Sequence, residues 1–106
     1  MAQFDVYRNP GQTRQHVPFV VAVQSAIFDS YERRMVIPLV RASSFAQTEP
    51  TRFNPTFTVE GVRVILHPLE MSSIPASRLA EPVASLADHG DGIIAAIDEL
   101  ITRAYG

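Results

Sequence analysis

The chain has 106 residues, a formal net charge of −2 and no cysteine. This length suits a single domain spanning 1–106, and the lack of cysteine excludes disulfides and thiolate zinc sites. No stretch approaches the roughly 20 apolar residues that span a bilayer, and no secretory signal is visible, so we expect a cytoplasmic protein without a membrane partner. The mild acidity and scattered arginines disfavour direct nucleic-acid binding.

The first half of the chain predicts β-strands. Residues 3–7 alternate apolar and polar side chains, as a half-buried strand does, and residues 9–17 predict an exposed loop. Two β-branched apolar runs, 19–24 and 35–40, then predict adjacent strands buried on both faces. Because Pro38 has no N–H to donate to a ladder, we expect the second of these strands to be an edge strand or to bend there.

The second half continues with shorter strands. Residues 41–55 are polar and predict a loop with one helical turn at most. Residues 56–59 and 62–67 predict a hairpin in which Gly61 takes a positive φ at low steric cost. Residues 71–74 predict another short strand.

Helix signals are confined to the end of the chain. Asp88 and Asp91 are candidate N-caps before a periodic run. The run predicts one apolar stripe made of Ile93, Ile97, Leu100, Ile101 and Ala104. Glu99 and Arg103 are spaced for an ion pair on the opposite face. Many strands followed by one helix predict a mostly β, α+β fold.

The sequence gathers no set of side chains for catalysis or metal binding. The three histidines lack partners at metal-ligand spacing, so we expect no metal and no cofactor. Neither a G-x-S-x-G motif nor a cysteine supplies a nucleophile, so we expect no enzyme. Arg33-Arg34 leaves two interpretations: a grip on an RNA phosphate, or a solvated strand entry or salt bridge, which we favour.

Several segments, in the same order along the chain, resemble the CcdB family of toxins. They are Gln3-Phe4-Asp5-Val6-Tyr7, Val23-Gln24-Ser25 followed by Arg33-Arg34-Met35-Val36-Ile37-Pro38-Leu39, Met71-Ser72-Ser73-Ile74-Pro75, residues 81–86 and residues 93–98. The resemblance implies an SH3-like barrel with a main antiparallel sheet, a small secondary sheet and one C-terminal helix.

The resemblance also implies a function. It implies a homodimeric, non-enzymatic toxin of a type II toxin–antitoxin module that binds the DNA gyrase A subunit and traps the gyrase–DNA cleavage complex. A cognate CcdA-like antitoxin neutralises such a toxin, and modules of this kind serve plasmid maintenance. Two alternatives stay open: a MazF-like endoribonuclease on the same barrel, and a non-poisoning chromosomal homologue that only binds its antitoxin.

The family resemblance assigns candidate partner-binding residues. The gyrase-binding loop falls on Ile27 and Phe28, and the helix end falls on Asp98, Ile101, Thr102, Arg103, Ala104 and Tyr105. The family ends in Trp-Gly-Ile, whereas this chain has no tryptophan, and Tyr105 is the aromatic residue nearest to that position. For the acidic antitoxin tail, two arginine-bearing loops predict contacts through Arg8, Arg14, Arg41 and Arg52.

Overall fold

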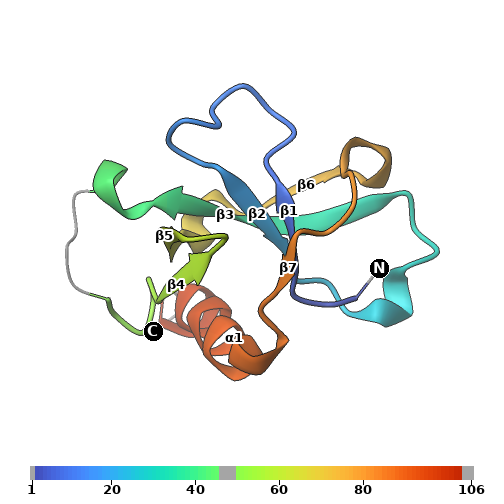
Figure 1. Cartoon of the computed structure of the whole chain (residues 1–106). Helices are drawn as coiled ribbons and strands as arrows, with labels where there is room; N and C mark the ends of the chain where they lie inside the picture. Colours follow the sequence, from blue (N-terminus) through green and yellow to red (C-terminus); the bar gives the residue numbers. More distant parts are fainter. Residues whose placement is uncertain (1, 46–49, 104–106) are drawn as a thin grey trace.

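The computed structural model describes residues 2–45 and 50–103 (Figure 1). Its strands are β1 (Asp5–Arg8), β2 (Phe19–Ala22), β3 (Arg33–Arg41), β4 (Thr56–Val59), β5 (Val62–Leu66), β6 (Ser72–Pro75) and β7 (Ala84–Ser85). The helix α1 (Gly90–Asp98) continues into the π-helical segment η6 (Glu99–Arg103). Short 3-10 turns connect the strands: η1 (Ala26–Phe28), η2 (Ala42–Ser44), η3 (Pro68–Glu70), η4 (Ala76–Arg78) and η5 (Ala87–His89).

The described strands form one antiparallel sheet in the order β4-β5-β3-β2-β1-β7, with β6 as a side branch on β3. The sheet is nearly closed into a barrel, and α1 packs below it, beside β4 and β7 (Figure 1). An ion pair of 2.9 Å between Arg8 and Glu60 joins the end of β1 to the β4–β5 turn. The predicted mostly β fold with one C-terminal helix is therefore confirmed.

Strands β2 and β3 are neighbours and are buried on both faces, as their apolar runs predicted. Because side chains alternate along a strand, each strand contributes to two cores. The main core joins the strands to the helix and contains Val21, Ile37, Leu39, Ile93 and Ala96. A smaller core on the other face contains Tyr7, Val20, Ala22 and Val36. The second face of the sheet therefore carries apolar side chains that the helix does not cover.

Pro38 lies in an interior strand, which corrects the expectation of an edge strand. One side of β3 pairs with β2, while on the other side β6 pairs with residues 33–36 and β5 with residues 39–41. The Pro38 carbonyl accepts a hydrogen bond from the His67 N–H on this second side, at 3.1 Å. Since N–H and C=O of one strand residue point the same way, the missing N–H of Pro38 falls at the gap between β6 and β5.

The helix begins differently from the prediction. Its N-cap is His89, whose side chain makes no capping hydrogen bond, so the predicted N-caps were wrong. Asp88 lies in the preceding turn η5, and Asp91 lies in the first turn of α1. Gly90, the first residue of α1, packs closely on Phe4, since a Cβ at position 90 would lie 2.7 Å from Cε2 of Phe4.

The buried stripe of the helix ends earlier than predicted. Ile93 and Ala96 are fully buried, and Ile97 packs against the same core. The last turns then widen into the π-helical η6, which changes the angular step between residues. Ile101 is consequently 63% exposed, outside the stripe, and Ala104 lies outside the described residues. Among the residues described, no helix combines the length and apolarity that crossing a membrane requires.

The β4–β5 hairpin has the predicted turn. Glu60 has a φ of 50° and Gly61 a φ of 78°, so two consecutive residues are left-handed, as the tight turn of a twisted hairpin requires. The short strand β7 was not predicted, because its two residues carry too little pattern to be distinguished from a loop.

Candidate functional site

The turn between β2 and β3 presents apolar side chains to solvent. Ile27 is 79% exposed, Phe28 44% and Tyr31 64%. Phe28 and Tyr31 contact each other edge to face, with ring centroids 5.8 Å apart. Ser25 begins the turn, since its Oγ accepts a hydrogen bond from the Ile27 N–H at 3.4 Å. We call Ile27, Phe28 and Tyr31 the apolar turn.

Two polar side chains lie beneath this turn and bind its backbone. Arg34 is only 8% exposed and donates to the carbonyls of Asp29, Tyr31 and Arg33. Gln24 Nε2 donates to the carbonyl of Phe28 at 3.4 Å and to that of Arg33 at 3.2 Å. Arg34 and Gln24 therefore both donate hydrogen bonds to backbone carbonyls in and beside the apolar turn.

The predicted helix-end residues lie in α1 and η6. Asp98, Ile101 and Thr102 are exposed, and Arg103 is the last residue of η6. The predicted contacts Ala104 and Tyr105 lie outside the described residues.

Within one subunit, the two predicted gyrase-binding elements are not adjacent. In Figure 1 the apolar turn (cyan) lies on the right of the molecule, whereas the end of the helix (dark red) lies on the left. The helix runs beneath the sheet from β7 towards β4, so its last turn points away from the β2–β3 connection. The structure therefore offers two separate exposed surfaces.

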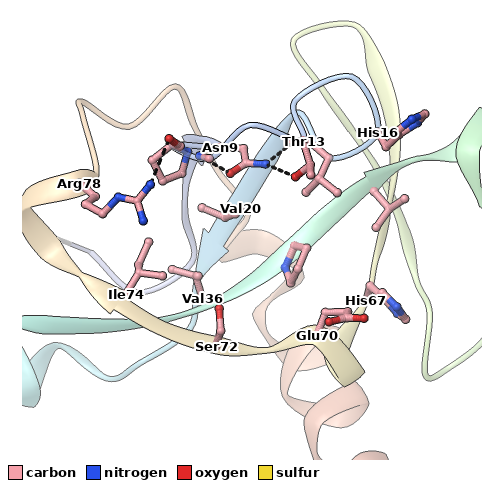
Figure 2. Close-up of a pocket in the computed structure, with 15 residues that line it drawn as sticks. Asn9, Thr13, His16, Val20, Val36, His67, Glu70, Ser72, Ile74 and Arg78 are labelled. Carbon is pink, nitrogen blue, oxygen red and sulfur yellow. Dashed lines mark hydrogen bonds between the residues drawn. The ribbon is translucent and has the colours of Figure 1, made fainter.

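A groove of about 500 Å³ lies on the second face of the sheet, opposite the helix (Figure 2). Its floor is apolar and consists of Val20, Val36, Pro38, Val40 and Ile74. Its rim is polar and includes Asn9, Thr13, His16, His67, Glu70, Ser72 and Arg78. Arg78 donates to the Pro10 carbonyl at 3.4 Å, which ties the β6 side of the rim to the loop after β1.

Asn9 organises the loop that forms one wall of the groove. Its Nδ2 donates to the Val17 carbonyl at 2.8 Å and to Thr13 Oγ1 at 3.2 Å, while its Oδ1 accepts from the Gly11 N–H at 2.9 Å. Figure 2 shows Asn9 at the centre of these bonds. The loop at 9–17 is thus exposed, as predicted, yet held in a defined shape.

The four arginines predicted for the antitoxin lie in different places. Arg14 donates to the Asn9 carbonyl and Arg41 to the Gln15 carbonyl, so both hydrogen-bond to the loop that forms one wall of the groove. Arg8 pairs instead with Glu60 on the β4–β5 turn. Arg52 pairs with Glu99 at 3.4 Å, beside the helix end.

His67 is a polar side chain of the groove that the sequence could not assign. Its ring contacts Phe45 edge to face, with ring centroids 5.4 Å apart. Its Nδ1 is buried and has no hydrogen-bond partner among the described residues.

The arrangement of Arg33 and Arg34 favours a structural role. Arg33 donates to Oγ and to the carbonyl of Ser73 on β6, both at 2.8 Å. Arg34 is directed at the carbonyls of the apolar turn. Neither guanidinium is simply solvated: Arg33 bonds to Ser73 and Arg34 bonds to backbone carbonyls, which gives both residues a role within the fold.

Within residues 2–45 and 50–103, no cluster of three His, Asp or Glu residues is arranged to hold a metal ion.

Comparison with known families gives a match over nearly the whole chain. The family model described as CcdB protein matches residues 3–103. This span runs from the residues before β1 to the end of η6, so it includes the apolar turn, the groove and the helix. The chain belongs to the CcdB family.

Proposed function

We propose that this chain, as a member of a family of toxins of toxin–antitoxin modules, binds the DNA gyrase A subunit and traps the gyrase–DNA cleavage complex. It does so without catalysing a reaction of its own. A cognate CcdA-like antitoxin neutralises it, and the active form is a homodimer.

The exposed apolar turn is the observation that carries the gyrase assignment. Ile27 and Phe28 occupy the positions that the family resemblance gives to gyrase contacts, and both side chains face solvent. Tyr31 extends the same surface, although the sequence analysis did not include it. Contiguous exposed apolar side chains on a polar surface are typical of protein–protein contact sites, and aromatic residues are enriched there.

Tyr31 also bears on the missing tryptophan. Large aromatic side chains dominate binding energies at protein interfaces. In this chain the edge-to-face pair of Phe28 and Tyr31 supplies an aromatic surface at the turn rather than at the helix end. We therefore place the main anchor for gyrase on the apolar turn, with Ile101 and Thr102 as a second contact.

The groove on the second face is the proposed site of the antitoxin tail. An acidic tail with apolar side chains fits a groove that has an apolar floor and Arg78 in its lining, with Arg14 and Arg41 hydrogen-bonded to the adjoining loop. A segment that folds on binding suits such a groove.

The ribonuclease alternative receives less support. It requires arginine guanidinium groups directed at an RNA phosphate, whereas Arg33 and Arg34 are directed at carbonyls within the chain. The alternative of a non-poisoning homologue keeps the antitoxin groove and loses only the gyrase contact.

Three assays with the purified protein separate these functions. We expect inhibition of gyrase supercoiling, accumulation of cleaved DNA–gyrase complex, and no cleavage of RNA. RNA cleavage without an effect on gyrase would establish the ribonuclease. Antitoxin binding without an effect on either substrate would establish the non-poisoning homologue.

A further inference from the structure

We infer that Gln24 and Arg34 are positioning residues that hold the apolar turn in the conformation that binds a partner. The inference rests on the proposed function, because it takes the gyrase A subunit as that partner. Neither residue presents its side chain as a contact surface: Arg34 is 8% exposed and Gln24 is half-buried. Both act through the backbone of the residues that make contact.

Arg34 acts from beneath the turn. One guanidinium nitrogen, Nη1, donates to the carbonyls of Tyr31 and Arg33, and the other, Nη2, donates to that of Asp29 at 2.7 Å. A planar guanidinium offers donors in a fixed geometry, so it fixes the relative positions of the carbonyls that it binds. A lysine at this position has one nitrogen and no such fork.

Gln24 acts from the end of β2. Its Nε2 donates to the carbonyls of Phe28 and Arg33, while its Oε1 accepts from the Met35 N–H at 3.1 Å. The Gln24 side chain therefore joins Phe28, in the turn, to Arg33 and Met35 at the start of β3. Together, Gln24 and Arg34 bind three carbonyls of the connection and that of Arg33, the first residue of β3.

These hydrogen bonds keep the apolar side chains of the turn accessible to a partner. Exposed apolar side chains lower their free energy by folding back onto the protein surface, which would hide them from a partner. Hydrogen bonds that fix the backbone of the turn prevent that rearrangement and reduce the ordering cost at binding. Backbone bonds within the turn, such as Tyr31 N–H to the Phe28 carbonyl at 3.0 Å, close it internally, and Ala76 N–H to the Glu32 carbonyl at 2.8 Å attaches the end of the connection beside β6. Gln24 and Arg34 add the side-chain bonds to the carbonyls of Phe28, Asp29 and Tyr31.

The main test compares Gln24→Ala with Gln3→Ala. Gln3 also donates from Nε2 to a backbone carbonyl, that of Val23 at 3.0 Å, but does not contact the turn. We expect Gln24→Ala to accelerate amide hydrogen exchange at Phe28 and Tyr31 and to weaken binding to the gyrase A subunit by about threefold to tenfold. Gln3→Ala should change neither measurement.

A double-mutant cycle distinguishes positioning from a general loss of stability. In a Phe28→Ala background the contact is gone, so the added Gln24→Ala change should weaken gyrase binding much less than it does in the wild type. Arg34→Lys keeps the charge but loses the fork, and should behave like Gln24→Ala. Arg33→Ala, which loses a charge and two bonds to Ser73, is its control. If Arg34→Lys fails to fold, the Gln24 variants decide.

The outcomes separate this inference from the proposed function. Wild-type exchange rates and wild-type gyrase affinity in Gln24→Ala would overturn the positioning role. Equal losses in the wild-type and Phe28→Ala backgrounds would also overturn it. A wild-type protein that does not bind the gyrase A subunit overturns the proposed function, and the exchange rates then decide whether Gln24 holds the turn.

Discussion

At the scale of single residues, Ile27 tests the apolar turn most directly. Its side chain is 79% exposed, so Ile27→Ser should leave the thermal midpoint unchanged. If Ile27 is a hot spot, gyrase binding should weaken by about 2 kcal/mol, or roughly 30-fold. Leu69→Ser is the matched control, because Leu69 is 65% exposed but lies on η3, away from the turn. Equal affinities for both variants, measured by titration with the gyrase A subunit, would contradict the assignment.

Tyr7 gives a prediction about pH. Burial raises the pKa of its phenol above the ordinary value of 10.0, and the Asp5 carboxylate raises it further. Because the unfolded state then releases this proton first as the pH rises, the contribution to stability is complete below pH 10 and is lost above it. When the pH is raised from neutral to above 10, the free energy of unfolding should therefore fall less in Tyr7→Phe than in the wild type, as measured by urea unfolding.

The pair Arg33 and Arg34 shows what can be read from sequence at this scale. Both lie before the predicted strand at 35–40, so the sequence assigned neither side chain to a face; in the structure both belong to β3, where Arg33 is exposed and Arg34 is buried. The sequence could not say which face is covered, because the covering segments come from β6 and from the connection before β3. The exposed position of Tyr31 was not predicted either. The signal that could have indicated it is an aromatic residue in a connector too short to reach the core.

At the scale of elements, β2, β3 and the hairpin were predictable because strong periodic patterns and turn residues specify them locally. The start of the helix was not, because no side chain caps it. The place of Pro38 inside the sheet was not predictable either, because the gap between β6 and β5 arises only where these two strands meet on β3. The groove likewise combines segments from both halves of the chain, and no local pattern indicates it.

Two glycines of α1 test the packing of the helix on Phe4, the residue before β1. A Cβ on Gly90 would approach Phe4 within 2.7 Å, whereas a Cβ on Gly92 would meet nothing within 4 Å. Gly92→Ala should stabilise the fold by up to about 1 kcal/mol, through helix propensity. Gly90→Ala gains the same propensity but forces Phe4 to move, and overpacking typically costs about 1–3 kcal/mol. Denaturant midpoints should therefore move in opposite directions, and equal stabilisation by both would contradict the packing.

At the scale of the whole molecule, the sheet separates the proposed antitoxin groove from the helix. Arg14→Ala with Arg41→Ala should slow association with an acidic antitoxin tail at low salt, because charges at a binding site raise the association rate. Arg52→Ala is the control, since Arg52 lies beside Glu99 and the helix end. Stopped-flow mixing with the cognate antitoxin measures the rates. Equal slowing by all three changes would indicate a general charge effect instead of the groove.

The same separation of surfaces leads to the prediction of a dimer. A subunit with the apolar turn on one side and the helix end on the other presents each element to a different part of a large partner. A two-fold dimer repeats both elements symmetrically, which matches a partner that is itself two-fold symmetric. Sedimentation at micromolar concentration should therefore give twice 11.7 kDa. Ile27→Ser should sediment identically, because we propose the apolar turn as a gyrase contact rather than as part of the subunit interface. A monomeric wild type would contradict the two-fold mechanism, and a monomeric Ile27→Ser would reassign the turn to the dimer.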